Sequence, residues 1–348
     1  RSGAGGMEGK FPESKSHCEA KIWAAGRGDE VEEEEEEGKC RTEDLPEELL
    51  ALAEELDIEL EVNDGLLEEL DLSDQNLERI PPEVFLCDSL KELCLEDNLI
   101  TSLSEKVGSL SELTELYLRR NRLQVLPASI GDCAKLDSLY LEDNKLEEDS
   151  FPKEIGRLKA LVGLPLHRNL LRHVPEVILS LTGLEELYLN ENQLENLPEN
   201  FGDLVNLREL GLSNNNLREL PDSLGELRQL KVFHCENNKL VKLPKTVGRL
   251  ESLTKLYIQD NRLEKLHSCI GRCSKLQVIN AENNNLKKVA KRISELSHLR
   301  HLLLAHNHLT SLPERVLANA AKLRRLTLVG NALEASVAGL ERLTDDPF

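Results

Sequence analysis

One recurring pattern constrains the fold of this chain more than any other feature. The spacing Leu-x-x-Leu-x-Leu-x-x-Asn-x-Leu occurs twelve times in the 348 residues, and nine of its eleven intervals are 23 residues long. The first leucines of the copies are Leu67, Leu90, Leu113, Leu136, Leu161, Leu184, Leu207, Leu230, Leu253, Leu276, Leu299 and Leu323. Such self-similarity predicts a stack of equivalent units rather than one large globular core.

The leucines of each copy predict a short strand. Alternate residues of a strand point to opposite faces, so Leu187 and Leu189 face one side and Tyr188 the other. A single strand cannot bury its leucines alone, whereas stacked copies form a parallel sheet with a continuous leucine core behind it. Because leucine fills the core, few aromatic residues are needed, and they make up only 3% of the chain.

The asparagine of each copy stands where the chain turns away from the strand. A side-chain amide both donates and accepts hydrogen bonds without carrying charge, so a column of asparagines can satisfy the backbone groups of successive turns. The column contains Asn98, Asn121, Asn144, Asn169, Asn192, Asn215, Asn238, Asn261, Asn284, Asn307 and Asn331, with Gln75 in the first copy.

The segment after the asparagine adds a second signature. Leu-Pro pairs such as Leu197-Pro198 come first, and pairs such as Ile130-Gly131, Ile155-Gly156 and Ile270-Gly271 follow in other copies. With this Leu-Pro-x-x-Ile-Gly-x-Leu pattern, residues 67–348 resemble the leucine-rich repeats of intracellular Ras-suppressor, Scribble and Erbin type. The resemblance implies an α/β fold, a leucine-rich-repeat solenoid or horseshoe with a parallel concave β-sheet, and about twelve repeats with helical caps. It also implies a cytosolic scaffold that binds small GTPases, phosphatases or polarity proteins.

The ends of the chain differ from the repeats. Residues 1–43 are rich in glycine, serine and charge, which predicts a disordered acidic tail. Residues 44–66 contain a helical apolar pattern and are expected to cap the first repeat, since terminal repeats need covering. The repeats then occupy residues 67–331, and residues 332–348 are expected to form a C-terminal helical cap.

Composition excludes several classes of function. The net charge of −21 disfavours nucleic acids and anionic membranes, and no apolar run is long enough to span a membrane. The chain shows no secretory leader and no Asn-x-Ser/Thr acceptor, and its eight cysteines show no disulfide framework. These features predict a cytoplasmic protein, and we expect a monomer.

The candidate binding residues gather on the predicted concave face. All four tyrosines of the chain fall at one position of the repeat, between the last two strand leucines, and charged residues surround the first two. Exposed tyrosine and arginine are typical anchors of interfaces, although tyrosine also favours strands and neighbouring charges can simply neutralise one another. The predicted partner-binding residues are Tyr117, Arg119, Arg120, Arg122, Tyr140, Glu142, Asp143, His167, Arg168, Tyr188 and Tyr257.

The sequence offers little support for catalysis or cofactors. It contains no Gly-rich phosphate loop, no H-E-x-x-H and no G-x-S-x-G. His301, His306 and His308 cluster in one repeat, but His306 and His308 flank an inward asparagine and should diverge, so no metal site is predicted. We therefore expect no enzyme and no cofactor. The leading hypothesis is a protein-binding adaptor in intracellular signalling, and the alternative is a substrate-receptor or regulatory subunit of a phosphatase or ubiquitin ligase.

Two neighbouring repeats break the pattern. The fourth carries two extra residues near Glu147–Phe151, and the strand of the fifth contains Gly163 and Pro165. Proline has no N–H to give to a neighbouring strand, so the sheet is expected to loosen at this point.

Overall fold

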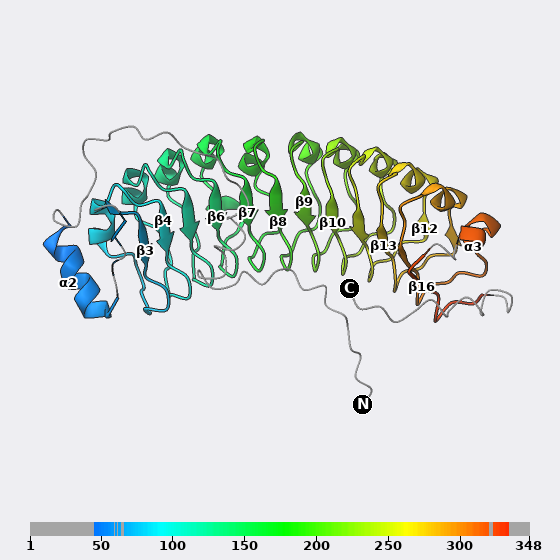
Figure 1. Cartoon of the computed structure of the whole chain (residues 1–348), viewed down its shortest axis with the longest axis horizontal. Coiled ribbons are helices and arrows are strands. Elements are labelled where there is room, and N and C mark those ends of the chain that lie inside the picture. The colour runs from blue at the N-terminus through cyan, green and yellow to red at the C-terminus, as the bar shows by residue number, and fades with distance from the viewer. Residues whose placement is uncertain (1–44, 59, 61, 64–65, 320–322, 334–348) are drawn as a thin grey trace, which may run out of the picture. The chain divides into compact units, whose positions relative to one another are not determined.

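The repeats form one continuous coil of chain. The computed structural model describes residues 45–58, 60, 62–63, 66–319 and 323–333, all of which belong to one unit, residues 40–348. Each of the first eleven turns of the coil contains one short strand and, on its opposite side, a 3₁₀ helix or short α-helix (Figure 1). The strands line the concave face and the 3₁₀ helices the convex face, so the predicted leucine-rich-repeat solenoid with a parallel sheet is confirmed.

The concave sheet has twelve strands, and each is hydrogen-bonded to the strand of the next repeat. All neighbours are parallel, and equivalent residues of successive repeats lie side by side, as in Leu187 beside Leu210. The strands are β3 (Glu69–Asp71), β4 (Glu92–Cys94), β5 (Glu115–Tyr117), β6 (Ser138–Tyr140), β7 (Gly163–Pro165), β8 (Glu186–Tyr188), β9 (Glu209–Gly211), β10 (Val232–His234), β11 (Lys255–Tyr257), β13 (Val278–Asn280), β15 (His301–Leu303) and β16 (Arg325–Thr327).

The convex side is built from short helices. The 3₁₀ helices are η2 (Pro82–Leu86), η3 (Glu105–Ser109), η4 (Ala128–Asp132), η5 (Glu148–Ser150), η6 (Lys153–Arg157), η7 (Glu176–Ser180), η8 (Phe201–Asp203), η9 (Asp222–Glu226), η10 (Lys245–Arg249), η11 (Ser268–Arg272) and η12 (Lys291–Glu295). The glycine in most of them is required by close packing. A Cβ at Gly225, for example, would lie 2.5 Å from the carbonyl oxygen of Thr246 in the next repeat.

Smaller elements complete the described chain. Helix α2 (Glu47–Leu56) precedes an antiparallel pair, β1 (Val62–Asn63) and β2 (Leu66–Leu67). A separate parallel pair, β12 (Lys265–Leu266) and β14 (Lys288–Val289), lies beyond the main sheet, and α3 (Glu314–Asn319) occupies the convex side of the penultimate turn. The predicted acidic tail, residues 1–43, and residues 334–348 of the predicted C-terminal cap lie outside the described residues.

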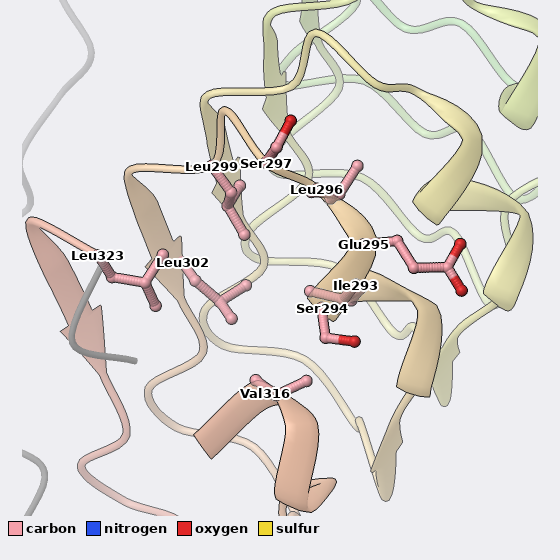
Figure 2. Close-up of a pocket in the computed structure, with 9 residues that line it drawn as sticks. All are labelled: Ile293, Ser294, Glu295, Leu296, Ser297, Leu299, Leu302, Val316 and Leu323. Carbon is pink, nitrogen blue, oxygen red and sulfur yellow. The ribbon is translucent and has the colours of Figure 1, made fainter. Parts of the chain in front are cut away.

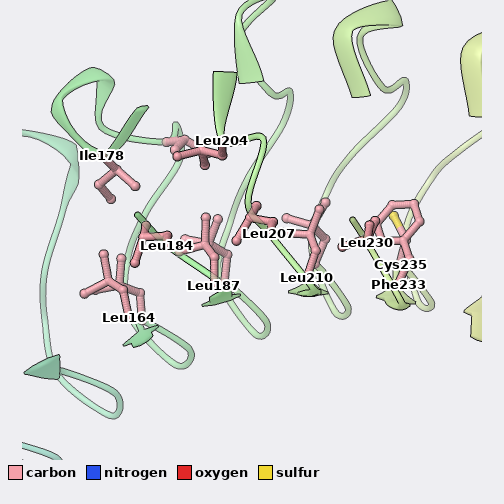
Figure 3. Close-up of a cluster of buried hydrophobic side chains, with 14 of the residues drawn as sticks. Leu164, Ile178, Leu184, Leu187, Leu204, Leu207, Leu210, Leu230, Phe233 and Cys235 are labelled. Carbon is pink, nitrogen blue, oxygen red and sulfur yellow. The ribbon is translucent and has the colours of Figure 1, made fainter. Parts of the chain in front are cut away.

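The core is a column of leucines between the two sides of the coil. Leu164, Leu187 and Leu210 are the middle residues of successive strands, and all three are buried (Figure 3). Phe233 continues this row in the next repeat, and Cys235 is equivalent to Leu212 in a second buried row. Burying one such side chain contributes roughly 1.5–3 kcal/mol, so the repeated leucines dominate the stability of the array.

The asparagine column satisfies the turns as the sequence predicts. The Nδ2 of Asn192 donates to the carbonyl oxygens of Leu166, Leu189 and Asn190 at 2.9, 3.1 and 3.2 Å. Its Oδ1 accepts from the N–H of Leu171 at 3.0 Å. Each asparagine therefore joins its own turn to the preceding repeat.

The two irregular repeats are accommodated differently. The extra residues of the fourth form η5, where the Ser150 hydroxyl donates to the carbonyl of Gln124 at 2.6 Å and ties the insertion to the preceding repeat. Fewer residues are paired between the strands at Pro165. β6 and β7 share a single pair, Ser138 with Gly163, whereas β7 and β8 share three. The strand irregularity thus shortens the sheet locally, while the insertion is well bonded.

Candidate functional site

The candidate site is the concave face, where three rows of side chains run across the strands. The first row holds the first residue of each strand, the second row the third residue, and the third row the residue two positions further on. The second row reads Asp71, Cys94, Tyr117, Tyr140, Pro165, Tyr188, Gly211, His234, Tyr257, Asn280, Leu303 and Thr327. All four tyrosines therefore share one row of the sheet.

The first row changes charge along the solenoid. Its acidic part contains Glu69, Glu92, Glu115, Glu186 and Glu209. Its last four members are Lys255, Val278, His301 and Arg325. The first row is thus acidic over the first seven strands and neutral to basic over the last four.

The first two tyrosines form a stacked pair. The rings of Tyr117 and Tyr140 have centroids 4.5 Å apart and an interplanar angle of 3°. Tyr117 is only 3% exposed, and its hydroxyl donates to Glu115. The prediction that Tyr117 is an exposed anchor is therefore wrong, because the neighbouring ring covers it, whereas Tyr140 remains partly exposed.

The other two tyrosines are partly exposed and also have partners. The hydroxyl of Tyr188 donates to Glu209 Oε2 at 2.8 Å. Tyr257 stacks on His234, with centroids 4.5 Å apart, and His234 was missed by the sequence analysis. Burial, followed by the nearby carboxylates, raises the pKa of Tyr140, Tyr188 and Tyr257, so all three stay protonated at neutral pH.

The charged candidates form ion pairs, and some of these are buried. Arg119 is 7% exposed and Glu142 is fully buried, with Nε and Oε1 3.9 Å apart, so neither is a surface anchor as predicted. In the turn that follows β7, the exposed Arg168 pairs with Glu191 at 3.1 Å and with Asp143 at 3.6 Å. The remaining predicted arginines are also exposed, Arg120 in an ion pair with Asp97 at 2.8 Å and Arg122 beside it.

His167 continues the third row after Glu142. It is partly buried, and its Nδ1 has no hydrogen-bond partner among the described residues. Burial lowers the pKa of His167 to about 4, and the positive charges of Arg168 and Arg119 add to the effect. The imidazole is therefore neutral at physiological pH.

A pH-dependent stability difference follows from His167. The unfolded chain binds a proton on this side chain near pH 6.5, while the folded chain does so only near pH 4. The contribution of neutral His167 to the unfolding free energy is therefore fully present above pH 6.5, its pKa in the unfolded chain. It is lost as the pH falls towards about 4, its pKa in the folded chain. We expect wild type to lose about 2 kcal/mol more unfolding free energy than His167→Gln between pH 7 and pH 5, measured by urea titration. Equal losses in the two proteins would contradict the buried neutral imidazole.

The described residues offer little to a small ligand or a metal. A pocket of about 120 Å³ lies between η12 and α3, lined by apolar residues such as Leu302 and Val316 and by polar ones such as Ser294 (Figure 2). Ligand pockets are usually several times larger. In the described part of the chain, no group of three or more His, Cys, Asp or Glu side chains could hold a metal ion, and no helix there is long and apolar enough to cross a membrane.

The described cysteines are buried thiols. Cys87, Cys94, Cys133, Cys235, Cys269 and Cys273 are all free and buried. Burial raises the pKa of Cys133 to about 11 and that of Cys273 to about 12. Because the thiolate is the reactive form, these side chains behave as small core residues and not as nucleophiles.

Known structures share this fold. An LRR protein of Leptospira interrogans is 28% identical, with 81% of this chain and 84% of that chain covered and a TM-score of 0.59. The plant peptide hormone receptor RGFR1, solved in complex with RGF2, is 29% identical over 80% of this chain, with a TM-score of 0.68, and this chain spans about half of that receptor chain (47%). The internalin InlF of Listeria monocytogenes, 19% identical with 80% and 85% covered and a TM-score of 0.62, shows the fold alone.

Family comparisons match most of the repeats. A model described as "Leucine-rich repeat region" matches residues 191–327, and one described as "Leucine rich repeat" matches residues 89–146 and 159–217. No curated protein matches the chain. The repeat frame, the twelve-stranded sheet and these matches agree, and the chain belongs to the leucine-rich repeat proteins.

Proposed function

We propose that this chain is a protein-binding adaptor of intracellular signalling that holds its partner on the concave face. It acts as a monomer in the cytoplasm, without catalysis or a cofactor of its own, and belongs to the Ras-suppressor, Scribble and Erbin type. The partner is a signalling protein such as a small GTPase or a phosphatase. The resemblance of the Leu-Pro-x-x-Ile-Gly segments to that type supports this assignment.

The observation that carries the proposal is the arrangement of aromatic and charged side chains on the concave sheet. Tyr140, Tyr188 and Tyr257 are partly exposed, stand in one row, and lie beside a first row that changes from acidic to basic. Tyrosine anchors surrounded by complementary charge are typical of protein interfaces. An extended partner segment can contact successive strands of such a face.

Three further observations support it. Leucine-rich repeat proteins generally mediate protein binding. RGFR1 has the same fold and 29% sequence identity to this chain, and its structure was solved in complex with RGF2. The six buried free thiols suit a reducing compartment, which favours a cytoplasmic location.

Site-specific photo-cross-linking tests the proposal. A benzoylphenylalanine is placed in the full chain at Ser138 or Lys255, which lie in the first row, and the control carries it at exposed Val205 after η8 on the convex side. We expect a discrete adduct from cytosolic extract at a concave position and none at Val205. Mass spectrometry then identifies the partner. Adducts formed equally at Val205, or only there, would place binding outside the concave face.

A further inference from the structure

Strand β7 leaves a gap in the rows of concave side chains. Its two concave residues are Gly163 and Pro165, which lie in register with Glu186 and Tyr188 of β8. A Cβ built on Gly163 meets no atom within 4 Å, so the space above this residue is open. Gly211, the other glycine in these strands, differs because its Cβ would lie 2.6 Å from the side-chain amide of Asn190. Of these two strand glycines, only Gly163 has open space on the concave face.

Aromatic side chains stand on both sides of this gap. Tyr140 comes from β6 and has Tyr117 stacked on the side away from β7, which leaves its other face towards the gap. Tyr188 comes from β8, and its hydroxyl is held by Glu209 of the following strand. Neighbouring strands lie about 4.8 Å apart, so the backbones that carry the two rings are about 10 Å apart. Pro165 takes the second-row place between them, and the open place lies next to it, over Gly163.

The rim of the gap is acidic. Glu186 lies directly beside Gly163, and Glu209 of the following strand accepts from the Tyr188 hydroxyl. The nearest arginines are already paired, Arg119 with Glu142 and Arg168 with Glu191 and Asp143. The net charge at the rim of the gap is therefore negative. It favours binding of a cationic side chain and disfavours a phosphate or a carboxylate.

We propose that this gap, bounded by Tyr140, Tyr188, Gly163 and Pro165, receives an arginine side chain from an extended segment of the partner protein. The inference rests on the proposed function. It specifies which side chain of the partner binds at one position of the concave face. A guanidinium is planar and stacks on aromatic faces, and its fork pairs with a carboxylate such as Glu186. Lysine supplies the charge without the planar group and binds more weakly.

The four tyrosines provide a direct test. The chain contains only four, so 3-fluorotyrosine labelling gives four ¹⁹F signals, which single Tyr→Phe variants assign. The probes are N-acetyl-arginine methylamide and its neutral citrulline analogue, added at millimolar concentration to the full chain. We expect arginine to shift the Tyr140 and Tyr188 signals saturably, to leave Tyr257 unchanged, and to bind roughly tenfold more tightly than citrulline.

Filling the gap should abolish this response. Gly163→Val places a β-branched side chain in open space on a strand, where it is tolerated, and should remove the arginine-dependent shifts. Val232→Ile, which enlarges a β-branched side chain at the same strand position of β10, should leave them intact. Shifts that persist in Gly163→Val, equal binding of citrulline, or no saturable shift would each overturn the inference. Concave cross-links without arginine binding would overturn this inference alone, whereas arginine binding with convex cross-links would overturn the proposed function alone.

Discussion

Replacing Asn192 with alanine is expected to lower the free energy of unfolding by about 3 kcal/mol, because the buried N–H of Leu171 loses its acceptor and three carbonyl oxygens each lose one of their two donors. The amide of Asn192 donates to three carbonyl oxygens and accepts from the N–H of Leu171, and its side chain is only 7% exposed. Water cannot replace these bonds without opening the turn. Urea titration followed by circular dichroism gives the measurement.

Two further variants separate hydrogen bonding from side-chain volume. Asn192→Asp keeps the shape but turns the donor into an oxygen that faces three carbonyl oxygens, so it should cost at least as much as alanine. Gln193→Ala, at the exposed neighbouring position, should change the unfolding free energy by less than about 0.5 kcal/mol. If the aspartate variant were as stable as wild type, the donors of Asn192 would not be what holds the turn.

The regular part of the fold could be predicted from the sequence because each repeat position has one dominant physical task. The leucines of the frame are buried, and the asparagine column bonds to the backbone of two repeats, as for Asn192. From the sequence, the glycine of the convex turn is recognisable only as part of the family pattern. Its physical reason, the close approach of the Thr246 carbonyl to Gly225, became visible only when neighbouring repeats were placed side by side.

The candidate site was predicted less well because exposure depends on contacts between repeats. Tyr117 looked like an anchor, but the ring of Tyr140 from the next repeat covers it. Arg119 and Glu142 looked like solvated charges, but the turn buries them both. One signal could have indicated this: Glu96, Arg119 and Glu142 occupy the same position of successive repeats with alternating sign, which suits ion pairs between adjacent turns.

Removing Arg119 while leaving Glu142 in place is expected to cost about 3–5 kcal/mol of unfolding free energy, as for other buried ion pairs that lose one partner. The carboxylate of Glu142 is fully buried, and the guanidinium of Arg119 lies 3.9 Å from it. Arg119→Met keeps most of the side-chain length, so the loss reports the charge more than the packing. The measurement is again urea titration at neutral pH.

A double variant and an exposed control complete the experiment. Arg119→Met combined with Glu142→Leu removes both charges and should recover most of the loss, because no uncompensated charge then remains buried. Arg168→Met breaks the pairs with Glu191 and Asp143, but its side chain is 48% exposed, so the expected cost is below about 1 kcal/mol. A double variant as unstable as Arg119→Met would show that packing of the arginine stem, not the buried charge of Glu142, accounts for the destabilisation.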